Sequence, residues 1–107
     1  MKRVDEIVEA FLAESDADNI ALPEIASAAR WELGAHTTDE ARAISLEVVG
    51  ALYDRGLRPG DYWGGAFQYW PDKGCQAVLD RIAREWIKAG ADPNLAEPIC
   101  WFAPQLK

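Results

Sequence analysis

Few side chains in this sequence are of the kinds that carry out catalysis. The only histidine is His36, next to a helix-capping threonine, and the two cysteines, Cys75 and Cys100, lie in apolar surroundings. A thiol in such surroundings usually serves as a small core residue. No Cys-x-x-Cys, His-Glu-x-x-His or Gly-x-x-x-x-Gly-Lys motif occurs, and three such residues make no zinc site without distant carboxylates. We therefore expect a protein that is not an enzyme and that holds no metal and no cofactor.

The chain is acidic, and its acidic side chains are unevenly distributed. The sequence has 107 residues, 11 basic and 18 acidic side chains and a formal net charge of -7. Residues 1–56 hold 12 of the acids and 5 of the bases, whereas residues 57–107 hold 6 of each. A phosphate backbone would be repelled, so we expect no nucleic acid partner. The excess of acid serves either solubility or a basic protein partner.

Length and composition indicate a single-domain protein without a membrane span. One hundred and seven residues make a single domain, residues 1–107. No apolar run approaches the roughly 20 residues that a membrane span needs, and no apolar signal region follows the basic pair at the N-terminus. Two cysteines fit a reducing compartment better than a disulfide scaffold. We expect a cytoplasmic protein without a membrane partner.

Four apolar stripes at helical spacing predict four helices. They cover about residues 4–12, 23–34, 37–56 and 75–89, and Trp86 lies on the apolar stripe of the last one. The signals that delimit these helices are Pro23 at a start, the capping box Thr37-x-x-Glu40, and the glycines Gly34, Gly56 and Gly90 as stops.

Two segments are predicted to be extended rather than helical. Gly64-Gly65 stands between residues 62–63 and 66–67 and fits a two-residue hairpin turn. The β-branched and aromatic segment 98–102 fits a short strand that pairs beside the hairpin. The predicted fold class is therefore mainly α, with four amphipathic helices and a small β hairpin or short strands in the C-terminal half.

Residues 56–102 resemble a known group of proteins. The pattern runs from Gly56-Leu57-Arg58-Pro59-Gly60-Asp61 through an aromatic stretch to residues 77–86, then Gly90, residues 93–95 and residues 97–102. It is similar to small acidic bacterial proteins, some of which are immunity proteins of polymorphic or contact-dependent toxin systems. The resemblance implies a protein that binds and neutralises a cognate toxin domain. Because many such toxins act on nucleic acids and are basic, the acidic charge fits such a partner.

The alternative is a helical structural or interaction module, ankyrin-like or homodimeric, without a toxin partner. Gly56 and Gly90 lie 34 residues apart, close to the ankyrin period of about 33. The Thr-Pro-Leu-His opening of an ankyrin repeat is missing, and an aromatic, glycine-rich stretch replaces the expected helix pair. A large secreted protein encoded by the neighbouring gene would favour the immunity function over this alternative.

Two sets of residues are candidates for contact with a protein partner. The carboxylates of Glu14, Asp16 and Asp18 stand at the end of the first helix, where negative charge opposes the helix dipole. We expect Asp39 and Glu40 of the third helix as their neighbours. The second set is aromatic, because five of the eleven aromatic residues lie within residues 62–70. Most of these should cover the core, while Tyr62 and Trp63 are candidates for exposed anchors.

Overall fold

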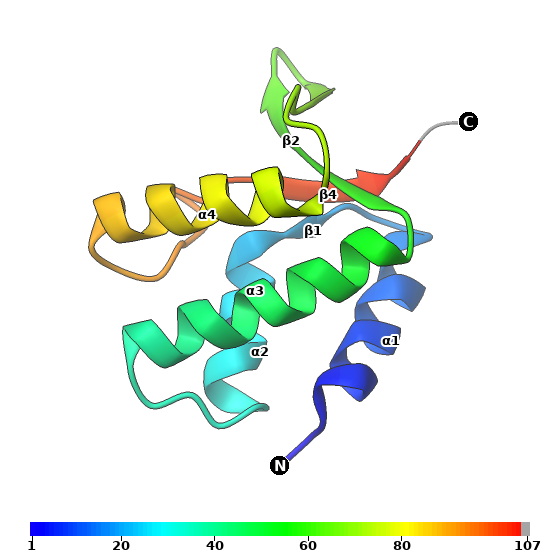
Figure 1. Cartoon of the computed structure of the whole chain (residues 1–107). Helices are drawn as coiled ribbons and strands as arrows, with labels where there is room; N and C mark the ends of the chain where they lie inside the picture. The colour runs from blue at the N-terminus through cyan, green and yellow to red at the C-terminus, as the bar shows by residue number, and fades with distance from the viewer. Residues whose placement is uncertain (106–107) are drawn as a thin grey trace.

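Helices and strands contribute together to this fold. The computed structural model describes residues 1–105 and contains, within them, four helices and one antiparallel sheet of four strands in the order β1-β4-β2-β3 (Figure 1). The helices are α1 (Val4–Ser15), α2 (Leu22–Trp31), α3 (Thr38–Asp54) and α4 (Cys75–Ala89). The strands are β1 (Ile20–Ala21), β2 (Leu57–Trp63), β3 (Ala66–Tyr69) and β4 (Trp101–Pro104).

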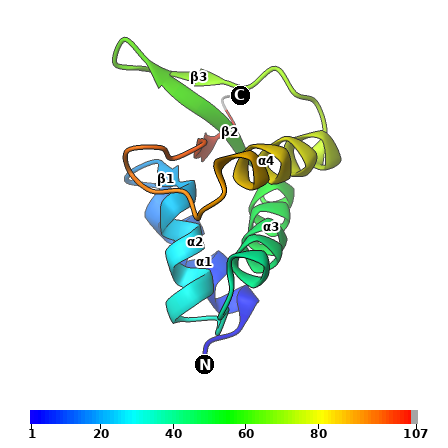
Figure 2. The same cartoon turned by 90° about the vertical axis from the view of Figure 1, so that its left-hand side faces the viewer.

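The sheet forms one layer of the molecule and the helices lie against one of its faces. In Figures 1 and 2, α1, α2 and α3 lie below the sheet and α4 lies beside it, while the β2–β3 hairpin extends beyond the helices. One core cluster joins the two layers. Its largest fully buried side chains come from both layers and include Trp86, Phe102, Ile20, Leu22, Ile25, Leu52 and Ile82.

The local signals for helices and for the hairpin turn are confirmed. The hydroxyl oxygen of Thr37 accepts the Glu40 amide at 3.1 Å, and a carboxylate oxygen of Glu40 accepts the Thr37 amide at 3.1 Å. The fourth helix covers 75–89 as predicted. Gly64 and Gly65 have φ values of 55° and 81°, the left-handed conformation that a two-residue hairpin turn needs at both positions.

The predicted fold class, mainly α with a small hairpin or short strands in the C-terminal half, is wrong. The sheet has four strands, and β1 belongs to the first half of the chain, so the fold is α+β. Strand β2 is longer than expected because it continues through Pro59, which reads as a loop signal in the sequence.

The pairing of β2 explains how a proline fits into an inner strand. Residues 57–60 pair with β4, and residues 60–63 pair with β3. The amide and carbonyl of one strand residue point to the same side. The carbonyl of Pro59 accepts the amide of Trp70 at 3.0 Å, so the missing proline N–H faces the side where β3 has already ended. The proline therefore interrupts no hydrogen bond to β4 and forgoes only the return bond to the Trp70 carbonyl, at the point where the β2–β3 ladder ends.

The tail strand is shifted from its predicted position. It covers Trp101–Pro104 rather than 98–102, and Ile99 has a φ of 67°, which interrupts an extended chain. The tail pairs with β2 on one side and with β1 on the other, so it lies beside the hairpin strand as predicted. The β2–β3 hairpin also occupies the span between Gly56 and Gly90, where an ankyrin repeat would place helices.

Candidate functional site

Four aromatic side chains form a row on the outer face of the sheet. Strand register places Trp101, Tyr62, Phe67 and Tyr69 on the same face as Gly60, while the buried Leu57, Pro59 and Phe102 face the helices. Neighbouring rings pack edge to face, with centroids 5.2 Å apart for Tyr62 and Trp101, 5.5 Å for Tyr62 and Phe67, and 4.9 Å for Phe67 and Tyr69. These four residues are called the aromatic row below.

Gly60 makes room for the aromatic row. A Cβ atom at this position would lie 2.6 Å from Cζ of Phe67 and would also collide with the carbonyl oxygen of Gln68. Cβ atoms in folded proteins do not come this close to other atoms. The surrounding atoms are already close-packed and leave no room for an added methyl group. The ring of Phe67 can therefore lie across β2 only where that strand has no side chain.

Replacing Gly60 with alanine should destabilise the fold by about 1–3 kcal/mol, because the new methyl group displaces the Phe67 ring and the β3 backbone. Gly50→Ala is the matched control. Gly50 lies inside α3, its Cβ would meet Leu79 at an ordinary 3.9 Å, and alanine is the better helix former by about 0.5–1 kcal/mol. Urea unfolding of both variants should give shifts of opposite sign, and a stable Gly60→Ala protein would contradict the described packing.

The rings of the aromatic row are held in place yet remain accessible. The hydroxyl of Tyr62 accepts a hydrogen bond from Nδ2 of Asn19, and the hydroxyl of Tyr69 donates one to the carbonyl of Pro104. Tyr62 is 45 % exposed and Tyr69 is 38 % exposed, and the other two rings are half-buried. Ordered aromatic rings that face solvent are the kind of residue that anchors a protein partner at low entropic cost.

The acidic residues predicted to bind a partner form a turn after α1. Glu14 lies in the last turn of α1, Asp16 caps the helix, and Asp18 is exposed two residues later. Residues 14–18 are called the acidic turn below. None of its carboxylates takes part in an ion pair with residues of the described part of the chain. The last turn of α1 contains no basic residue either.

The carboxylates around the acidic turn repel one another. Burial raises the pKa of Glu14 above its ordinary value, and the carboxyl group of Glu24 on α2 and that of Asp18 raise it further. A raised pKa means that the folded protein disfavours the charged form of Glu14. Local electrostatics therefore cost stability at this end of the molecule.

Glu14→Gln should slightly stabilise the protein at neutral pH. Solvent screening limits the gain to about 0.5 kcal/mol. Above its raised pKa the charged carboxylate of Glu14 lowers the stability of the folded protein. As the pH falls through that pKa, wild-type Glu14 takes up a proton and this cost disappears. The difference between variant and wild type should therefore vanish in acid. Thermal unfolding at several pH values measures it, with the exposed Glu47→Gln as control; a gain that persists in acid would contradict this cause.

The acidic turn and the aromatic row adjoin each other. The carboxylate of Asp18 accepts the amide of Asn19 at 2.8 Å, and the side chain of Asn19 reaches Tyr62. Asp16 lines a hollow of about 390 Å³ together with Pro104, whose carbonyl accepts the hydroxyl of Tyr69. The two features are therefore joined through Asn19 and Tyr62, and Asp16 shares its hollow with the residue to which Tyr69 is hydrogen-bonded. Together they are called the composite surface.

Asp39 and Glu40 do not join this surface. They lie in the first turn of α3, whereas the hollow beside Asp16 is bordered by Gly56 and Leu57, which follow the other end of that helix. A helix of 17 residues is about 25 Å long, so the two sets of acids are well separated. Glu40 acts in the capping box of α3. The structure thus separates two groups of residues that we expected to be neighbours.

Trp63 lies near the composite surface but points to the other side of the hairpin. It is 73 % exposed and stands directly before the Gly64-Gly65 turn, on the opposite strand face from Tyr62. Trp101 and Asn19 were not predicted as site residues. Their place depends on the pairing of the tail with β1 and β2, which brings together residues 80 positions apart in the sequence.

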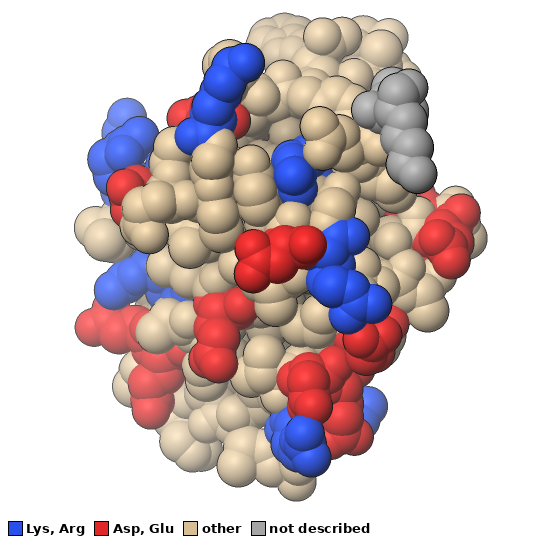
Figure 3. All heavy atoms as spheres, turned by 45° about the vertical axis from the view of Figure 1, so that its right-hand side comes forward, with Lys and Arg blue, Asp and Glu red and all other residues tan. Residues whose placement is uncertain are grey.

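Charged side chains are distributed unevenly over the surface. In Figure 3 carboxylates gather over the helical part of the molecule, and the top, where the hairpin lies, is largely uncharged. The hairpin, which carries Tyr62, Phe67 and Tyr69, therefore belongs to a largely uncharged part of the molecule that borders an acidic part.

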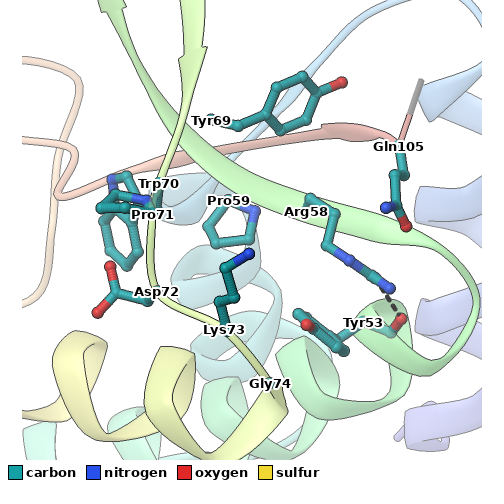
Figure 4. Close-up of a pocket in the computed structure, with 10 residues that line it drawn as sticks. All are labelled: Tyr53, Arg58, Pro59, Tyr69, Trp70, Pro71, Asp72, Lys73, Gly74 and Gln105. Carbon is teal, nitrogen blue, oxygen red and sulfur yellow. Dashed lines mark hydrogen bonds between the residues drawn. The ribbon is translucent and has the colours of Figure 1, made fainter. Parts of the chain in front are cut away.

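A second hollow lies beside the hairpin, between the end of α3 and the start of α4 (Figure 4). Its volume is about 560 Å³. The guanidinium group of Arg58 stacks 3.8 Å above the Tyr53 ring and donates to the Tyr53 carbonyl at 2.8 Å, so it closes the end of α3. Asp72 is paired with Arg81 at 2.7 Å. The side chains that line this hollow include no histidine and no cysteine.

The groups with catalytic potential are not brought together. Burial raises the pKa of the Cys100 thiol well above its ordinary value, and burial also raises the pKa of Cys75, so both thiols stay protonated. His36 is exposed. Within residues 1–105 no three histidine, cysteine or acidic side chains are arranged to hold a metal ion.

Comparison of the chain with protein-family models, curated proteins and solved structures gave no match. None of the helices in residues 1–105 combines the length and the apolar character that crossing a membrane requires.

Proposed function

We propose that this protein is a non-enzymatic binding protein whose partner is a basic protein domain. The observation that carries the proposal is the contact of Asn19 with Tyr62, which joins the acidic turn and the aromatic row into one surface. A central apolar patch beside charged residues is the usual composition of a protein interface. Unpaired carboxylates select a partner of opposite charge.

The class of partner follows from the resemblance of residues 56–102 to small acidic immunity proteins. We propose a toxin domain as the partner and neutralisation of the toxin, in the cytoplasm, as the function. An acidic surface can cover the basic face with which such a toxin approaches nucleic acid. Attraction between opposite charges accelerates the encounter, and this matters for a protein that must intercept a toxin before it acts.

Co-expression with the protein encoded beside its own gene tests this function. We expect a stable complex with a basic C-terminal toxin domain, and survival of cells that would otherwise be killed by that domain. A protein that forms a dimer with itself but neither binds the toxin domain nor protects cells would contradict the proposal and favour the homodimeric alternative. The same experiment includes a variant with Glu14→Gln, Asp16→Asn and Asp18→Asn. This variant should bind the toxin domain and protect cells less well than the wild type.

A further inference from the structure

We propose that the aromatic row receives arginine and lysine side chains of the basic partner, which stack on its rings beside the acidic turn. This inference rests on the proposed function and names the chemistry of the contact. A guanidinium or ammonium group is attracted to the face of an aromatic ring within about 6 Å of its centre. Aliphatic stems of the same side chains bury apolar ring surface.

The geometry of the row suits this kind of contact. Tyr62 stands at 62° to Phe67 and at 85° to Trp101, and Phe67 stands at 82° to Tyr69. Because neighbouring rings are steeply inclined to each other and not stacked in parallel, one ring does not cover the whole face of the next. The two tyrosine rings keep 45 % and 38 % of their residue surface exposed, so long side chains of a partner can lie over the row.

The same chain already holds arginine in this way elsewhere. The guanidinium group of Arg81 lies 3.6 Å from the centre of the Trp70 ring, and the carboxylates of Asp72 and Glu85 accept its hydrogen bonds at 2.7 and 2.8 Å. A ring and carboxylates together thus bind one guanidinium group. This arrangement combines stacking with ion pairing, which arginine does better than lysine.

The composite surface has the same two components, and Arg55, which borders its hollow, is paired with Glu9 instead of with the acidic turn. Rings of the aromatic row lie beside Asp18 through Asn19 and beside Asp16 through Pro104. In the described part of the chain, arginine stacks only on Tyr53 and Trp70, and no arginine or lysine pairs with the acidic turn. The missing cation is what a basic partner supplies.

The test uses short peptides as probes: hexa-arginine, hexalysine and, as a control, hexaglutamate. Titration into the ¹⁵N-labelled protein is followed by NMR, where tryptophan indole signals report on individual rings. We expect hexa-arginine to shift the indole signal of Trp101 and the backbone amides of residues 16–19 and 60–69. The indole signal of Trp31, which is 83 % exposed on α2, should stay in place. Hexalysine should bind more weakly, and hexaglutamate should not bind.

Ring variants separate stacking from simple charge attraction. Tyr62→Leu should weaken hexa-arginine binding about three-fold, the loss expected for one exposed cation–π contact. Tyr62→Phe keeps the ring, loses the hydrogen bond to Asn19 and should bind nearly as well as wild type. Trp31→Leu is the matched control for the loss of an exposed aromatic ring and should have no effect.

The outcomes distinguish this inference from the proposed function. If hexa-arginine shifts only the amides of residues 14–18, and Tyr62→Leu binds it as tightly as wild type, the rings take no cations, while the acidic turn can still bind a basic partner. Absence of any shift at the row would overturn the inference in the same way. Failure of the toxin domain to form a complex in the co-expression experiment is a separate result that overturns the proposed function itself.

Discussion

Replacing Trp86 with alanine should lower the free energy of unfolding by about 3–5 kcal/mol. The indole is fully buried on α4, within the core that joins the helices to the inner face of the sheet. Its Nε1 atom has no hydrogen-bond partner in the described residues, so the loss comes from packing and not from a broken hydrogen bond. Domains of this size have a total stability of about 5–15 kcal/mol, so the variant should be severely destabilised.

Trp31→Ala is the matched control for this experiment. Trp31 is 83 % exposed, so its removal should change the stability by no more than about 0.5 kcal/mol. Urea unfolding followed by circular dichroism measures both variants. Equal midpoints for Trp86→Ala and wild type would show that the apolar face of α4 does not pack against the sheet as described.

The second large effect concerns the rate at which the partner binds. Changing Glu14→Gln, Asp16→Asn and Asp18→Asn together should slow association with the basic toxin domain about ten-fold at low salt. High salt screens these charges, so the rates of variant and wild type should converge there. The fold should stay intact, because the three carboxylates make no ion pairs within residues 1–105.

A control with the same change in net charge separates a local effect from a general one. Asp39→Asn, Glu47→Gln and Glu97→Gln also remove three negative charges, and all three residues are exposed outside the composite surface. This control should slow association much less. Equal slowing by both triple variants would mean that net charge alone attracts the partner, and that the acidic turn has no special part in binding.

The helices could be predicted from the sequence because their signals are local. The capping box of Thr37 and Glu40, the stop at Gly90 and the Gly64-Gly65 turn depend on residues at most a few positions apart. The sheet could not be predicted in the same way. Strand β1 has only two residues, too few to show alternation, and β2 contains a proline whose missing donor matters only once its pairing is known.

The candidate site was predictable in its parts but not in its arrangement. The acidic turn follows from the end of the first apolar stripe, and Tyr62 follows from the aromatic segment. Their contact through Asn19 depends on the position of β1 beside β4, a long-range feature. The separation of Asp39 from Asp16 likewise depends on the lengthwise placement of α3, which no periodicity in the sequence indicates.

Hydroxyl-radical footprinting of the protein, alone and in complex with the toxin domain, tests the composite surface most directly, because it reports on aromatic side chains one by one. We predict that Tyr62, Tyr69 and Trp101 lose reactivity in the complex, while the exposed Trp31 keeps it. Loss of reactivity at Trp31 with an unchanged aromatic row would contradict the account and place the partner on α2 instead.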